Sequence, residues 1–154
     1  MLVEPILRSV PEWFGIEEST LAYVSASARV PTWAAFKTYP IAAPSEALGF
    51  VSISQHYPLS AEVHCMAVRR SWHRKGIGAS LLLYCEDELR RAGVRYLQVK
   101  TQGPSLPCEQ YARTTRFYEA SGFVALEEVH GLWPGVPTLI LVKSLGSWPS
   151  VLLR

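Results

Sequence analysis

The stretch VRRSWHRKGIGAS, residues 68–80, guides the interpretation of the whole chain, because it is rich in cations and ends in two glycines where a helical pattern begins. Its cations are Arg69, Arg70, Arg74 and Lys75. A helix N-terminus carries a partial positive charge, so cations there are unfavourable unless an anion binds. Backbone N–H groups at a helix start are unpaired, and glycine lets a ligand approach them closely. The stretch therefore predicts a site for a phosphate-like anion, the alternative being a solvated surface turn with an incidental Gly-x-Gly.

Two common nucleotide-binding motifs do not fit this stretch. The order Gly-Lys-Ser/Thr of a P-loop is absent, and a dinucleotide fingerprint would need a third glycine near Leu81. The chain has a net charge of only +2, so the residues outside the stretch are slightly acidic. This indicates a local anion site rather than a broad surface for nucleic acid.

Hydrophobic patterning predicts an α/β fold of about seven strands and three or four helices, in one domain that spans residues 1–154. The expected strands are 5–10, 32–39, 48–54, 61–68, 94–101, 123–130 and 138–145, and the expected helices are 11–28, 79–93 and 111–122. In the first helix, Leu21 and Val24 are expected on one face. In the second, the pairs Glu86–Arg90 and Asp87–Arg91 are expected on the exposed face.

The strand 61–68 carries several of the residues that matter for chemistry. Strict alternation would place Glu62, His64 and Met66 on one face and Cys65 on the other. A cysteine facing away from the polar side chains, like Cys85 on the buried stripe of the next helix, is a poor nucleophile. Cys108, in a loop, is the cysteine whose reactivity deserves a test.

Composition narrows the class of protein. The chain has 49% hydrophobic and 18% charged residues, as soluble globular proteins do. Its three cysteines lie far apart, which is typical of free thiols in a reducing compartment. No signal peptide and no apolar run of roughly 18 residues is found, so we expect a cytoplasmic protein without a membrane partner. The histidines show no metal-ligand spacing, so we expect no metal: they are His56, His64, His73 and His130.

Two segments together resemble a known family. The strand HCMAV (64–68), followed after four residues by HRKGIGASLLLYCEDEL (73–89), resembles motif A of the GNAT superfamily of acetyl-CoA-dependent N-acetyltransferases. That motif reads Arg/Gln-x-x-Gly-x-Gly/Ala at the start of a long helix. RFYEASGF (116–123) resembles the family's FYxxxGF segment. The resemblance covers about residues 45–143, and it implies a twisted mixed sheet with helices on both faces, whose fourth and fifth strands diverge to admit acetyl-CoA.

The resemblance also implies which residues hold acetyl-CoA. The pantetheine arm would pair with the backbone of Met66, Ala67 and Val68. The pyrophosphate would rest on the turn formed by His73, Arg74, Lys75, Gly76, Ile77, Gly78 and Ala79. His73 stands where the family has Arg or Gln, so its backbone N–H rather than its side chain is expected to bind phosphate. Tyr111 and Thr114 stand where the family often has Asn and Ala, and the Tyr111 hydroxyl is expected to replace the asparagine's pantetheine contact.

Three side chains are the candidates for catalysis. Tyr118 matches the family tyrosine that commonly protonates the CoA sulfur, although a core aromatic residue is the plain structural alternative. Glu62 lies six residues before Val68, where the histone-acetylating branch carries its catalytic glutamate, and is the first candidate for the base. His64, acting directly or through water, is the second. A backbone N–H near Met66 or Ala67 would stabilise the oxyanion.

The expected function is transfer of the acetyl group of acetyl-CoA to a primary amine of a small molecule or a peptide N-terminus, by direct attack in a ternary complex. We expect the protein to act as a monomer or a homodimer, without a nucleic-acid partner. The alternatives are a non-catalytic acyl-CoA-binding sensor module and a nucleic-acid binder that uses residues 69–75. The resemblance implies that three segments shape the acceptor pocket, residues 11–24, 55–62 and 131–138. These segments supply Trp13, Phe14, Tyr57 and Trp133, with the acids Glu12, Glu17 and Glu18, although ordinary hydrophobic packing is the alternative for the aromatic residues.

Overall fold

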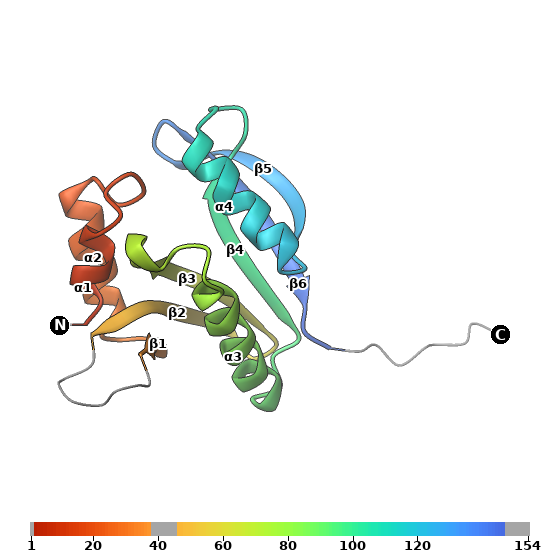
Figure 1. Cartoon of the computed structure of the whole chain (residues 1–154). Coiled ribbons are helices and arrows are strands. Elements are labelled where there is room, and N and C mark those ends of the chain that lie inside the picture. The colour runs from red at the N-terminus through yellow and green to blue at the C-terminus, as the bar shows by residue number, and fades with distance from the viewer. Residues whose placement is uncertain (1, 38–45, 147–154) are drawn as a thin grey trace.

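The computed structural model describes residues 2–37 and 46–146. A six-stranded mixed sheet has the order β1-β2-β3-β4-β6-β5, in which β3 and β4 are parallel and all other neighbours antiparallel (Figure 1). The strands are β1 (Thr32–Phe36), β2 (Ala47–Tyr57), β3 (Ser60–Val68), β4 (Tyr96–Gln102), β5 (Val124–Trp133) and β6 (Val136–Ser144). The helices are α1 (Glu4–Arg8), α2 (Glu17–Ser27), the 3₁₀ turn η1 (Arg70–Trp72), α3 (Ile77–Arg91) and α4 (Glu109–Ala120).

Within the described residues the sheet has six strands rather than about seven, because residues 5–10 are not a strand. They belong to α1 and the turn after it. The buried side chains are Val3, Ile6, Leu7 and Val10, which recur at helical spacing. Pro5 sits in the first turn of α1, where its missing N–H costs nothing. Of the expected strand 32–39, residues 38 and 39 lie outside the described part of the chain.

Helices cover both faces of the sheet, as predicted. On one face α1 and α2 pack over Phe50, Cys65 and Ala67. On the other face α3 and α4 pack over Val51 and Leu97. Within the described residues, the helices are too short or too polar to cross a membrane.

The most consequential feature of the sheet is that β3 and β4 separate along their length. They pair only from Ser60↔Tyr96 to Val63↔Val99. Both strands then continue, β3 to Val68 and β4 to Gln102, and diverge as Figure 1 shows. The predicted divergence of two parallel central strands is therefore confirmed.

A β-bulge at His64 changes which side chains share a face of β3. Ser52 pairs with Cys65 and Ile53 with Val63, so His64 has no partner on β2. Val63 therefore packs on the α3 side, whereas Cys65 packs on the α1 and α2 side. The expectation that strict alternation holds along this strand is wrong.

Two expectations about helix faces are also wrong. Leu21 of α2 is 48% exposed, and the buried residues of that helix are Thr20, Val24 and Ser27. In α3 the predicted apolar stripe is buried, but Glu86 is buried with it at 1% exposure. Arg91 pairs with Glu88 rather than with Asp87.

Candidate active site

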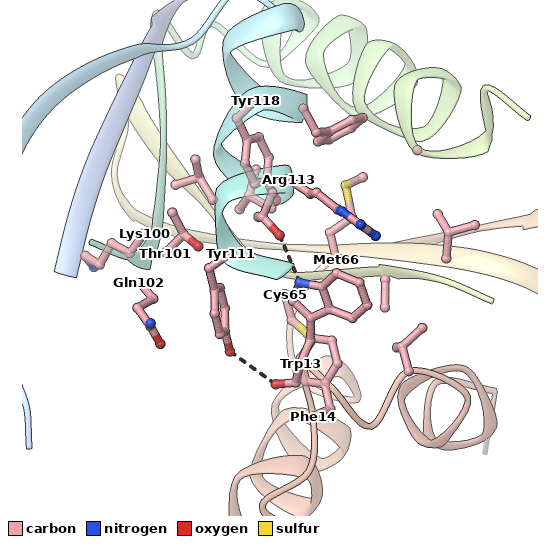
Figure 2. A pocket seen from close by; sticks show the side chains of 18 of the residues that line it. Trp13, Phe14, Cys65, Met66, Lys100, Thr101, Gln102, Tyr111, Arg113 and Tyr118 are labelled. Carbon is pink, nitrogen blue, oxygen red and sulfur yellow. Dashed lines mark hydrogen bonds between the residues drawn. The ribbon is translucent and has the colours of Figure 1, made fainter. Parts of the chain in front are cut away.

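A cleft of about 1200 Å³ opens where β3 and β4 diverge, and its walls come from α2, α3, α4, the loop before α2 and the β5–β6 turn. Most of the residues expected to bind the cofactor or to act in catalysis line it. Glu62 and Lys75 do not. Figure 2 shows the side chains of β3, β4 and α4 around this cleft.

One wall of the cleft is the edge of β3 beyond the bulge. Cys65 to Val68 pair with β2 on their other side, while the ladder to β4 has already ended at Val63. Within the described residues, this edge therefore has no backbone partner. An unpaired strand edge readily accepts another extended chain with amide groups.

The floor at the start of α3 is a turn with backbone donors. Arg74 has φ +58° and Gly76, which precedes the first residue of α3, has φ +78°. The first N–H groups of a helix have no intrahelical partners, and α3 has no side-chain cap and no acidic residue in its first turn to accept from them. Successive N–H groups in such a turn form a concave anion site.

The four cations of residues 68–80 divide into two kinds. Arg69 and Arg70 form ion pairs with glutamates. Arg74 and Lys75 form no ion pair with a described residue, and Lys75 lies 4.6 Å from the centre of the Trp72 ring. Only the two cations next to the unpaired N–H groups therefore lack an anion.

His73 does something other than what the sequence predicts. Its Nε2 lies 2.7 Å from the Val68 carbonyl, so Nε2–H donates to the end of β3. Its backbone N–H donates to the Arg70 carbonyl at 3.1 Å. The ring thus holds the turn against β3 and the backbone bond closes η1, so the phosphate donors are left to the residues after His73.

Gly78 permits close packing at the inner end of the cleft. A Cβ atom there would lie 3.1 Å from Met66 Cε and 3.3 Å from the Phe117 ring. The start of α3 therefore sits directly against Met66 of β3 and Phe117 of α4.

Tyr118 is buried, with 6% of its surface exposed, yet it lines the cleft. Its ring packs against Phe117 and Phe123 at centroid distances of 5.2 and 5.4 Å. Its hydroxyl forms no hydrogen bond with any described residue. Burial, with smaller contributions from Cys65 and Cys85, raises the pKa of Tyr118 well above its ordinary value. The hydroxyl is therefore protonated at neutral pH and available to a ligand.

Glu62 and His64 lie on the same side of the sheet but in different surroundings. Both Glu62 oxygens accept from Lys100 Nζ, at 3.0 and 2.9 Å, and Gln98 adds a third contact at 3.3 Å. The side chain of His64 lines the cleft and meets Tyr23 edge-on, with ring centroids 5.6 Å apart. The histidine is thus open to the cleft, whereas the carboxylate is held by a lysine.

A bridge that sequence reasoning missed joins the loop before α2 to α4. Trp13 Nε1 donates to Thr114 Oγ1 at 3.0 Å, and the Tyr111 hydroxyl donates to the Trp13 carbonyl at 3.3 Å (Figure 2). The Tyr111 hydroxyl, expected to contact pantetheine, is therefore already bonded to the loop. Tyr23 and Lys100 were missed as well, although the alternation of Lys100 with buried Val99 and Thr101 was a signal that it shares a face with other polar groups.

Only some of the residues expected to shape the acceptor pocket line the cleft. Trp13, Phe14 and Trp133 line it, whereas Tyr57 lies elsewhere and is 72% exposed. The three acids expected there do not line it. Glu12 pairs with Arg70, and Glu17 with Arg8.

Comparison with known proteins agrees with this geometry. The model of the acetyltransferase (GNAT) family matches residues 10–123. A Desulfovibrio desulfuricans protein assigned to the GNAT family is similar in structure, with a TM-score of 0.73, 20% identity, and coverage of 94% of this chain and 91% of that one. So is an aminoglycoside 6′-N-acetyltransferase complexed with coenzyme A, with a TM-score of 0.72, 19% identity, and coverage of 96% and 91%. The Escherichia coli ribosomal-protein-S18-alanine N-acetyltransferase has a TM-score of 0.65, 18% identity, and coverage of 88% and 82%. No curated protein matches the chain.

Proposed function

The chain belongs to the acetyltransferase (GNAT) family, and we propose that it transfers the acetyl group of acetyl-CoA to a primary amine, by direct attack in a ternary complex. One observation carries the proposal. Beyond Val63 the edge of β3 that faces β4 has no strand partner among the described residues, and it leads into a turn where Arg74 and Lys75 form no ion pair with a described residue. An extended arm with amides at one end and a pyrophosphate at the other fits both features at once.

Different residues are proposed to bind the two parts of acetyl-CoA. Met66, Ala67 and Val68 offer backbone groups to the pantetheine arm, and the turn from Arg74 to Ala79 receives the pyrophosphate. Gly76 keeps that backbone open, since nothing lies within 4 Å of where a Cβ would be. Arg74 and Lys75 supply charge without competing ion pairs to described residues.

His64 is the residue we propose to take the proton of the attacking amine, directly or through water. An alkylamine is mostly protonated at neutral pH, since its pKa is about 10, and it must lose a proton to attack. His64 lines the cleft, and its ring forms no hydrogen bond with a described residue. Glu62 is the weaker candidate, because both of its oxygens are already hydrogen-bonded to Lys100 and it does not line the cleft.

Tyr118 is the residue we propose to protonate the leaving thiolate. A thiol of pKa about 8.5 leaves more readily when a proton is supplied, and the Tyr118 hydroxyl keeps its proton because burial raises its pKa. A backbone N–H near Met66 or Ala67 would stabilise the charge that develops on the carbonyl oxygen.

The test is release of CoA thiol over a panel of amines, with calorimetric binding of CoA measured in parallel. Tyr118→Phe should lower kcat by about 10²-fold or more while CoA still binds. Tyr84→Phe is the matched control, since Tyr84 is 56% exposed and lies outside the cleft. Turnover unaffected by Tyr118→Phe would remove its assigned role. Tight binding without turnover of any amine would instead favour a non-catalytic acyl-CoA-binding module.

A further inference from the structure

The part of the cleft away from the α3 turn has aromatic walls from four separate segments. Phe14 comes from the loop before α2, Tyr23 from α2, Tyr111 from α4 and Trp133 from the end of β5. If the chain is the acetyltransferase proposed above, this is where the acceptor amine must bind. Aromatic faces attract a single ammonium group and pack against an apolar body.

No aspartate or glutamate of the described residues lines the cleft. The charged side chains that do are cations, namely Arg74, Lys100, Arg113 and Arg116. Residues 1, 38–45 and 147–154 contain no Asp or Glu in the sequence. The residues that the structure does not describe therefore add no acidic side chain to the cleft.

Two acids whose neighbours in the sequence line the cleft are engaged by cations of the protein itself. Glu62 is bonded through both oxygens to Lys100, and its side chain is only 12% exposed. Glu12 is paired with Arg70. A second or third ammonium group on an acceptor would thus lose water without gaining a counter-charge, and it would lie near Lys100.

We propose that the acceptor is a monoamine: a molecule whose reacting amine is its only cationic group, attached to an aromatic or apolar body. This excludes polyamines and aminoglycosides, even though the fold is that of an aminoglycoside acetyltransferase. The proposal deepens the function proposed above by naming the substrate class of the same cleft.

The acceptor class is tested by measuring amine binding rather than turnover. In this way the monoamine proposal and the proposed acetyltransferase function can each be refuted without the other. 2-Phenylethylamine and spermidine are titrated calorimetrically into the full chain, with and without saturating CoA. The monoamine should bind at least about 100-fold more tightly than spermidine. Equal or tighter binding of spermidine, or no binding of the monoamine, overturns the acceptor class. Absence of thiol release despite the expected preference would instead overturn only the enzymatic function.

Removing the cation that neutralises Glu62 tests whether the lack of a free carboxylate is what disfavours acceptors with several ammonium groups. In Lys100→Met the Glu62 carboxylate next to the cleft would no longer be neutralised by the lysine. Spermidine affinity should therefore rise by about 10-fold or more, while the affinity for 2-phenylethylamine changes little. Lys37→Met, which removes the same charge outside the cleft, should change neither. Lys100→Gln, which keeps a hydrogen-bond donor, guards against misfolding of the methionine variant. An unchanged spermidine affinity in both folded Lys100 variants refutes the argument.

Discussion

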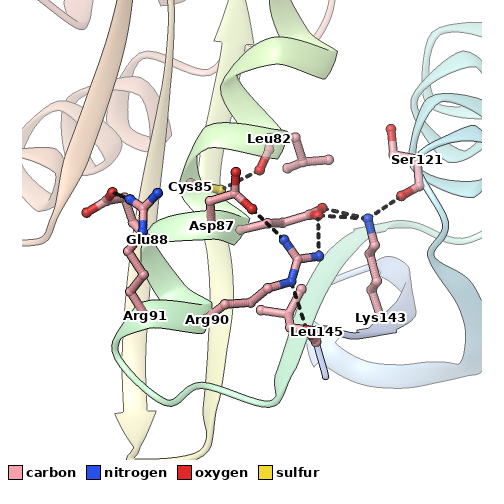
Figure 3. Close-up of polar contacts among 10 residues, drawn as sticks. Leu82, Cys85, Asp87, Glu88, Arg90, Arg91, Ser121, Lys143 and Leu145 are labelled. Carbon is pink, nitrogen blue, oxygen red and sulfur yellow. Dashed lines mark hydrogen bonds and ion pairs between the residues drawn. The ribbon is translucent and has the colours of Figure 1, made fainter. Parts of the chain in front are cut away.

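Replacing Lys143 by methionine should cost this protein a large part of its stability, because Lys143 serves a carboxylate that has almost no access to water. Lys143 Nζ lies 2.8 Å from both oxygens of Glu86 and 2.7 Å from the Ser121 carbonyl (Figure 3). The contacts join β6 to the middle of α3 and to the end of α4. Glu86 is 1% exposed, so water cannot replace the lysine.

The size of the loss follows from what is left around Glu86. Without Lys143, the carboxylate keeps one ion-pair partner, Arg90 Nη2 at 3.4 Å. Removing one partner of a buried ion pair costs about 3–5 kcal/mol, and methionine preserves most of the lysine's apolar packing. The double variant Glu86→Leu/Lys143→Met removes both charges and should regain most of that loss, since apolar replacements of a buried pair are often neutral.

Urea unfolding followed by circular dichroism measures these differences. Arg91→Met is the control, because it breaks the exposed pair with Glu88 and should cost about 0–1 kcal/mol. If Lys143→Met costs no more than Arg91→Met, Glu86 is not the buried charge described here. If the double variant is as unstable as the single one, the loss comes from packing and not from an unpaired charge.

Two further predictions concern the turn and the pH range. Gly76→Val should abolish the rise in Tm caused by acetyl-CoA. Gly93→Val, which has a similar φ of +85° but lies outside the cleft, should keep that rise. Each variant should lower the free energy of unfolding in urea by about 1–2 kcal/mol, because each forces a branched residue to positive φ. Burial raises the pKa of the Cys65 and Cys85 thiols from the ordinary value of 9.0 to about 12. Between these values the unfolded chain releases protons that the folded chain retains, so the free energy of unfolding should be steady below about pH 9 and then fall by up to about 1.4 kcal/mol per pH unit for each thiol. Between about pH 9 and pH 10, below the ordinary pKa of tyrosine, Cys85→Ala should remove about half of that slope, and a slope equal to the parent's in this range would contradict the assignment.

The region that could be predicted well from the sequence is the one whose signals are local. Gly76 precedes α3 in a backbone conformation that favours glycine, and Leu81, Leu82, Cys85 and Leu89 bury themselves at helical spacing within one element. Such features depend on neighbours a few residues apart, so strand, turn and helix were found in the right order.

Features that depend on distant partners could not be found this way. Glu86 reads as a surface residue until Lys143, 57 positions later, is known to lie beside it. The bulge at His64 leaves the sequence pattern of β3 intact while reversing which residues face α3. The strand expected at residues 5–10 was wrong for another reason. A short apolar run fits a strand or a helix equally well, and Pro5 suits the first turn of a helix.

The same distinction explains why the fold alone is a poor guide to the acceptor. The edge of β3 and the turn before α3, where we propose that CoA binds, come from one continuous segment. The acceptor walls are brought together from α2, α4 and β5, and the Trp13–Thr114 contact alone joins residues 101 positions apart. The cleft-lining residues of α2, α4 and β5 can differ in charge without disturbing the segment around Gly76. The acceptor class must therefore be inferred from the residues that line the cleft, and here these carry aromatic rings and cations but no carboxylate among the described residues.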